Sequence, residues 1–386
     1  MRPFLLVASP SDPPDPRKGS NPYTPRWIAG IMVAELQDGR LKAELIAMGS
    51  LRVPRELLEG YRLSRSTAGP GAGSTSLALA WEGSDGREHH VKMAVALEGS
   101  VDAPVKLVRS SNGTLELRQR DGRLMVDGVW LLPIVMHAPD QAFISLDGEC
   151  IHECAFCTTH LMEGRRLNSR TAGRWVELVI EAYRRRPFHA LAITGVALAD
   201  HEAMMADYET IIRDVLAELP DLHVGVEPYV RGPEDIARLR RAGASEIKIN
   251  VQSPVQEILS RVCPGWSLET QYNLLEEAVR VFGRGRVTTN ILVGLGETDS
   301  DVEGSLDRLV TMGVIPSVRG IRVNDLNAPA LERALGHPVE GVDVERHLRL
   351  AGMLRDALDR HDLQASSLQT MCHRCGCCDL EPGQDV

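Results

Sequence analysis

Apolar and polar residues alternate in short runs between Trp27 and Met136. Dipeptides such as Asp-Gly, Asn-Gly and Gly-Ser separate these runs. Alternation with a period of two is typical of β-strands, and these dipeptides favour the tight turns of antiparallel hairpins. We therefore expect a β-rich N-terminal domain at residues 1–140, with residues 1 to about 24 as an extended, proline-rich arm. The expected strands are 76–81, 90–96, 114–118 and 124–131.

The pattern changes after residue 141, where apolar runs alternate with segments of helical periodicity. Strands that alternate with helices form parallel sheets joined by right-handed crossovers. Six such units predict an α/β fold, a partial (β/α)6 TIM-like barrel at residues 141–340. In such barrels the chemistry lies at the carboxyl ends of the strands. The expected strands are 142–146, 190–194, 223–227, 246–251, 287–293 and 318–323, and the expected helices are 171–186, 204–219, 233–242, 254–262, 268–282 and 299–312.

Composition narrows the classes of protein that this chain can represent. Of its 386 residues, 43% are hydrophobic, which is ample for a large core. No apolar run approaches the length of about 18 residues that a membrane helix needs, and the run at residues 4–8 is too short for a signal peptide. The net charge of −10 argues against nucleic acid as a partner, because proteins that bind it carry basic surfaces. We expect a cytoplasmic protein that binds neither membranes nor nucleic acid.

The first of two cysteine groups directly follows the first expected barrel strand, in the sequence Cys150-Ile-His-Glu-Cys154-Ala-Phe-Cys157. Three thiolates on one loop can ligate three irons of a [4Fe–4S] cube and leave the fourth iron open. Zinc is the main alternative for cysteines this close, with His152 or His160 as a further ligand. A disulfide is disfavoured, because three cysteines leave one thiol over.

With the aromatic Phe156 just before its last cysteine, this loop resembles the signature of the radical S-adenosylmethionine superfamily. The resemblance covers about residues 141–325 and points to the biotin synthase and lipoyl synthase branch. It implies that the open iron binds S-adenosyl-L-methionine and that an electron from the cluster generates a 5′-deoxyadenosyl radical. Cys150, Cys154 and Cys157 would then be the catalytic cluster ligands.

The resemblance also places S-adenosylmethionine contacts at the ends of three further strands. The second strand would receive the ammonium group, the fourth the ribose hydroxyls and the fifth the adenine. The residues themselves leave other readings open: a tight turn at Gly195, a helix N-cap at Asn250 and a glycine-rich turn capped by Thr298. The cofactor-binding candidates are Phe156, Thr194, Gly195, Asn250, Gln252, Val293 and Gly294.

After the sixth strand, Arg322 and Asn324 are substrate-binding candidates, since this region faces the substrate in biotin-synthase-like enzymes. A guanidinium can hold a substrate carboxylate in a bidentate pair. A surface salt bridge is the alternative for Arg322.

Residues 341–386 are expected to form a third region, with an amphipathic helix at 344–361, a short strand at 363–368 and a cysteine-rich tail. Short cysteine runs suit a second, auxiliary iron–sulfur cluster near the barrel mouth, and a zinc knuckle is the alternative. Clustered cysteines are typical of metal sites in a reducing compartment. Cys263 stands apart and is expected to be a buried or loop thiol. The tail ligand candidates are Cys372, Cys375, Cys377 and Cys378.

These features together predict a radical S-adenosylmethionine enzyme that abstracts hydrogen from an unactivated C–H bond, with sulfur insertion from the auxiliary cluster. Methylation or a carbon-skeleton rearrangement in cofactor biosynthesis is one alternative. A non-catalytic, zinc-stabilised barrel that acts in assembly or interaction is another. The expected partners are a small-molecule or protein-attached substrate, a reductant such as ferredoxin or flavodoxin, and a protein docked on the N-terminal β-domain.

Overall fold

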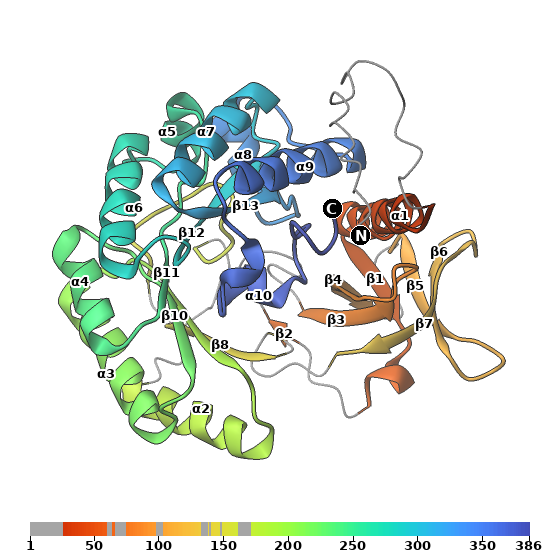
Figure 1. The fold of residues 1–386 in the computed structure, drawn as a ribbon, viewed down its shortest axis with the longest axis horizontal. Coiled ribbons are helices and arrows are strands. Elements are labelled where there is room, and N and C mark those ends of the chain that lie inside the picture. Colours follow the sequence, from red (N-terminus) through yellow and green to blue (C-terminus); the bar gives the residue numbers. More distant parts are fainter. Residues whose placement is uncertain are drawn as a thin grey trace, which may run out of the picture.

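The computed structural model describes residues 26–59, 64–65, 75–97, 103–132, 138, 140–146, 149–160 and 171–386. The extended arm predicted for residues 1 to about 24 lies outside these ranges. The described elements form two units, and the last residues of the chain run between them (Figure 1). No helix among the described residues is both long and apolar enough to cross a membrane.

The first described element is a helix, where the alternating pattern predicts strands. Helix α1 spans Arg26–Met48. The expectation of β-structure from Trp27 onward is therefore wrong for this segment. Ala43, Leu45 and Ile46 are buried in one core with the strands that follow, so α1 folds against the N-terminal sheet as a packed helix.

The strands that follow close into a six-stranded barrel. The order around the barrel is β3-β4-β1-β5-β6-β7, which closes because β3 also pairs with β7, and the short strand β2 pairs with β3 as a seventh strand of the sheet. The predicted antiparallel hairpins are confirmed for β3–β4 and β6–β7, and β5, which was not among the expected strands, pairs antiparallel with β6. Strand β1 instead lies parallel to both β4 and β5. The elements are β1 (Ser50–Val53), the 3₁₀ helix η1 (Arg55–Leu58), β2 (Ser64–Arg65), β3 (Thr75–Glu82), β4 (Glu88–Leu97), β5 (Val105–Arg109), β6 (Leu115–Gln119) and β7 (Leu124–Leu131).

The second unit is a parallel sheet of six strands in chain order, β8 to β13. Helices cover its outer face (Figure 1), as expected for a partial α/β barrel. The strands are β8 (Gln141–Leu146), β9 (Ala190–Gly195), β10 (His223–Glu227), β11 (Glu246–Lys248), β12 (Val287–Val293) and β13 (Ile315–Gly320), and the helices are α2 (Ala172–Arg185), α3 (His201–Glu218), α4 (Pro233–Ala242), α5 (Gln256–Val262), α6 (Leu268–Phe282) and α7 (Asp299–Met312).

Alternation along these strands gives the sheet two different faces. Ile144, Ile193 and Ile247 belong to the large core that the outer helices cover. The opposite face carries several buried polar side chains, among them Lys248 and Ser317. Two predicted strands had wrong bounds: β11 ends at Lys248 instead of Val251, and β13 begins three residues before Val318.

The last part of the chain fills this polar face. It contains α8 (Ala328–Leu335), α9 (Val344–Arg360), the 3₁₀ helix η2 (Ala365–Ser367) and α10 (Met371–Cys375). The strand predicted at 363–368 is wrong, because η2 forms there, and α8 was not predicted. Thr370 Oγ1 donates to Glu246 Oε2 at 2.7 Å, and Met371 N donates to Gln141 Oε1 at 3.0 Å. Since Glu246 and Gln141 begin β11 and β8, the tail enters from the amino ends of the strands.

Candidate functional site

The first cysteine group lies on a loop at the carboxyl end of β8. Backbone hydrogen bonds hold the loop to the segment after β9 and to the end of α5: Ile151 N donates to Ala197 O at 2.8 Å, and Ala155 N donates to Val262 O at 2.8 Å. A further bond within the loop, from Cys157 N to Cys154 O at 2.9 Å, closes a turn. The three thiols are therefore carried by a backbone that is fixed at both sides.

The pKa of Cys157 depends on its burial and on the charges of the other two thiols of this loop. Burial raises the pKa of Cys157, the hydrogen bond to Thr159 lowers it in part, and the charges of Cys154 and Cys150 add a smaller rise. Such mutual repulsion between thiolates is what a bound cation relieves. The three donors thus fit an iron–sulfur cluster, to which they would contribute three thiolates.

Cys263 is fully buried, as predicted, and its thiol hydrogen-bonds Cys154. This bond lowers the pKa of Cys154, so that Cys154 is the more acidic thiol of the pair. This contact could not be predicted from the sequence, because Cys154 and Cys263 are 109 positions apart.

The candidate S-adenosylmethionine residues all stand at the same edge of the sheet as the cysteine loop, because they follow β8, β9, β11 and β12. Thr194 and Gly195 end β9. A Cβ at Gly195 would lie 2.8 Å from Tyr208 Oη, so only glycine fits there without displacing that ring. The carbonyl of Phe156 accepts a bond of 3.0 Å from Asn327 Nδ2, which orients the last part of the loop.

Asn250 follows β11, the fourth strand of the parallel sheet, and it is not a helix cap. Its Nδ2 donates to Glu227 Oε1 at 2.6 Å, and its Oδ1 accepts from Asn290 N at 3.2 Å. The next helix, α5, has Val255 as its N-cap, so the N-cap alternative is wrong. Gln252 has a φ of 66° and pairs with Ile291 in an isolated parallel bridge. Glu227 was missed in the sequence, where a lone acid at a strand end is not a distinctive signal.

The strand-five turn has the predicted cap. Thr298 and Asp301 form a capping box at the start of α7. Gly294 has a φ of 96°, and Glu297 accepts from its backbone N at 2.6 Å. Val293 is fully buried in the large core, and its carbonyl accepts from Ile321 N at 2.8 Å.

The side chains of Arg322 and Asn324 form hydrogen bonds with backbone groups of the chain. Arg322 Nη1 donates to Ile46 O at 2.7 Å and Nη2 to Cys378 O at 3.0 Å. Burial lowers the pKa of Arg322, and the surface salt bridge considered for it is wrong. Asn324 Oδ1 accepts from the backbone N of Leu326 at 2.9 Å. Arg322 thus joins α1 to the cysteine tail.

Buried cations surround the C-terminal cysteines. Lys248 Nζ lies 3.6 Å from Cys372 Sγ. Burial raises the pKa of Cys378 to about 12, while the charges of Lys92 and Arg319 act in the opposite direction. Cys375 and Cys377 hydrogen-bond each other, which raises the pKa of Cys375.

Four thiols among buried positive charges fit an anionic iron–sulfur cluster, for which Cys372, Cys375 and Cys378, with Cys377 as a spare or fourth donor, are the candidate ligands. A preformed zinc site would hold thiolates about 3.8 Å apart, given Zn–S bonds of about 2.3 Å. Among the described residues, the group of three possible ligands whose atoms all lie within 4.8 Å of one another is Asp38, Asp85 and His89, and it contains no cysteine.

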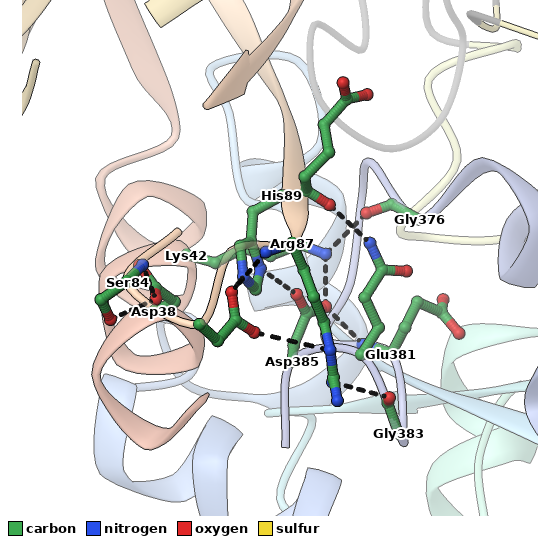
Figure 2. A network of polar contacts seen from close by, with 12 residues as sticks. Asp38, Lys42, Ser84, Arg87, His89, Gly376, Glu381, Gly383 and Asp385 are labelled. Carbon is green, nitrogen blue, oxygen red and sulfur yellow. Dashed lines mark hydrogen bonds and ion pairs between the residues drawn. The ribbon is translucent and has the colours of Figure 1, made fainter. Parts of the chain in front are cut away.

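Residues of the N-terminal unit, including α1, contact the cysteine tail through a buried polar network (Figure 2). Lys42 Nζ donates to Gly376 O at 2.7 Å and forms an ion pair with Asp385. The ring of His89 lies between Asp85 and Asp385, with contacts of 3.3 and 3.1 Å. The backbone N of Lys92 in β4 donates to Cys377 O at 2.7 Å. The cysteine tail is therefore held by both units.

Comparisons with known proteins place part of the chain beside one superfamily. Residues 145–309 match the family model described as the Radical SAM superfamily. A relative, the threonylcarbamoyladenosine tRNA methylthiotransferase MtaB of Thermotoga maritima, is 22% identical over 180 residues, which are 43% of this chain and 40% of that protein. The chain thus spans about two fifths of the length of this curated relative.

Solved structures with a similar arrangement include two proteins. The FeFe-hydrogenase maturase HydG from Carboxydothermus hydrogenoformans has a TM-score of 0.46 at 16% identity, covering 64% of this chain and 60% of that one. Methylornithine synthase (PylB) has a TM-score of 0.45 at 17% identity, covering 62% of this chain and 70% of that one.

Proposed function

We propose that this chain, whose residues 145–309 match the family model described as the Radical SAM superfamily, is a radical S-adenosylmethionine enzyme whose cluster is ligated by Cys150, Cys154 and Cys157. The observation that carries the proposal is the position of this cysteine loop. It follows the first of six parallel strands, and the other candidate cofactor residues end later strands at the same edge. With its cofactor bound, the cluster supplies the electron that turns S-adenosylmethionine into a source of the 5′-deoxyadenosyl radical.

The chain's own residues hold and shield this centre. Asn250, fixed by Glu227, would present its amide to the ribose hydroxyls, since an amide can both donate to and accept from a diol. Gly294, held by Glu297, would bring the backbone close to adenine. Leu292 and Leu295 belong to the apolar cluster around Cys154 and Ala155, which would keep water from the reacting atoms.

We propose hydrogen abstraction from an unactivated C–H bond followed by sulfur insertion, in the manner of the biotin synthase and lipoyl synthase branch. The C-terminal cysteines support this reaction, because an auxiliary cluster could supply the sulfur. The relative MtaB is named for methylthio transfer, which also introduces sulfur. Methylation or rearrangement of a carbon skeleton is the second candidate. A reductant such as ferredoxin or flavodoxin would deliver the electron, and the substrate would be a small molecule or a group attached to a protein.

Metal and sulfide analysis of anaerobically reconstituted protein tests the two-cluster proposal. The intact chain should hold about eight irons, and the variant with Cys372, Cys375 and Cys378 changed to alanine about four. Loss of labile sulfide into the product during turnover would support sulfur insertion over the second candidate. About four irons in the intact chain would refute the auxiliary cluster, and zinc in place of iron would favour the non-catalytic barrel.

A further inference from the structure

Four aromatic side chains meet beside the first cysteine loop. The ring of His152, between Cys150 and Cys154, lies with its centroid 4.9 Å from that of Tyr229 and 5.5 Å from that of Trp266. The ring of Tyr229 in turn lies 6.2 Å from His201. We call His152, Tyr229, Trp266 and His201 the ring cluster.

The ring cluster lies at the functional edge of the sheet. His201 is the first residue of α3, shortly after β9 ends at Gly195, and Tyr229 follows the end of β10 at Glu227. The bond from Ile151 N to Ala197 O ties the cysteine loop to the segment that leads into α3. The rings therefore belong to the same end of the barrel as the cofactor candidates.

Three polar atoms of the ring cluster are buried without a hydrogen-bond partner: His152 Nε2, His201 Nδ1 and Trp266 Nε1. The described residues contain ten such side-chain atoms. Three of the ten lie on the rings of this one cluster. Buried polar groups are normally paired, because each unpaired group loses its bonds to water without replacement. Their concentration beside the cysteine loop indicates that a ligand supplies the missing partners.

Asp235 fixes the role of His201. Asp235 Oδ2 lies 2.8 Å from His201 Nε2 and accepts from Arg231 N at 2.7 Å. A carboxylate only accepts, so His201 Nε2 carries a hydrogen, and Nδ1 is the acceptor of a ring that has its single hydrogen at Nε2. An indole N–H only donates. The ring cluster thus offers an acceptor at His201 and a donor at Trp266.

Building on the function proposed above, we propose that the ring cluster binds the polar edge of the substrate, through a group that has a hydrogen-bond donor next to an acceptor. A primary carboxamide and the edge of a nitrogen heterocycle have this pattern. Such a group would donate to His201 Nδ1 and accept from Trp266 Nε1, with its planar face against Tyr229. A carboxylate, which lacks a donor, would fit less well.

Fragment binding to the holoenzyme tests this proposal, with benzamide and benzoate as the probes. Titration calorimetry on reconstituted protein with S-adenosylmethionine should show tighter binding of benzamide. His201→Ala and Trp266→Phe should each weaken benzamide binding about tenfold, the value of one hydrogen bond worth about 1.4 kcal/mol. Trp266→Phe retains an aromatic ring and removes the indole N–H, so it guards against a variant that simply fails to fold. His337→Ala, at an exposed position, should leave binding unchanged.

Equal affinity for the two probes, no measurable binding of benzamide, or unchanged affinity in both site variants would overturn the proposal. These outcomes are distinguishable from failure of the proposed function. That failure appears in the wild-type protein as absent iron or absent cleavage of S-adenosylmethionine, before any probe is added.

Discussion

At the scale of single residues, spacing in the sequence identified the cysteines but not the side chains that surround them. Three thiols within eight residues form a pattern, whereas a single lysine or acid does not. In the folded chain, Lys248 and Lys92 lie near the C-terminal cysteines. Glu227 lies beside Asn250. Their roles could not be predicted, because each depends on contacts between residues far apart in the chain.

Two adjacent thiols offer a matched test at this scale. Cys154→Ala should abolish cleavage of S-adenosylmethionine and lower iron by about four per chain, because a ligand is lost. Cys263→Ala removes a fully buried neighbour of the same thiol and should keep both the iron and the cleavage. Iron counts and 5′-deoxyadenosine formation compare the two variants. Full iron and cleavage in Cys154→Ala would mean that Cys154 is not a ligand of this cluster, and equal loss in both variants would mean that Cys263 is also needed for it.

At the scale of elements, helices with clear periodicity and caps were predicted well. The bounds of α4, α6 and α7 agree with the sequence pattern, and each helix of this group ends at a glycine. Helix α1 could not be predicted from the sequence, because its apolar residues do not form a clear stripe along one face of the helix. The strand predicted at residues 363–368 is also wrong, because this segment crosses the end of the sheet without pairing with it.

Docking of α10 on the sheet can be tested at one glycine. A Cβ at Gly225 in β10 would clash with Oγ1 of Thr370. Gly225→Ala should therefore push the tail away from the sheet and lower the iron content of the reconstituted protein from about eight to about four. Gly304→Ala in α7, where a Cβ meets nothing within 4 Å, is the control and should keep all the iron. Full iron in Gly225→Ala would show that the tail site does not depend on this contact.

At the scale of the whole molecule, the alternating strand and helix pattern predicted the parallel sheet, since local periodicity carries that information. It did not predict that β1 lies parallel to its neighbours or that β3 pairs with β7 to close the first barrel. Those pairings join segments that are distant in sequence. The network of Lys42, His89 and Asp385, which joins the first barrel to the tail, has the same character (Figure 2).

The junction between the two units should respond to pH through His89. Burial lowers the pKa of His89, but its hydrogen bonds and ion pairs with Asp385 and Asp85 outweigh this and raise the pKa overall. A raised folded-state pKa stabilises the protein below the unfolded value of about 6.5, and the gain is lost as pH rises through the folded value. The thermal midpoint of wild type should therefore exceed that of His89→Gln by more at pH 6 than at pH 9. A difference that does not vary with pH would contradict this.

The account as a whole depends on a radical-generating cluster at Cys150, Cys154 and Cys157. The most direct measurement is the formation of 5′-deoxyadenosine by the anaerobically reconstituted protein with S-adenosylmethionine and a strong reductant. The account predicts 5′-deoxyadenosine in the wild-type protein and none in Cys154→Ala. Fully iron-loaded wild-type protein that forms no 5′-deoxyadenosine would contradict it.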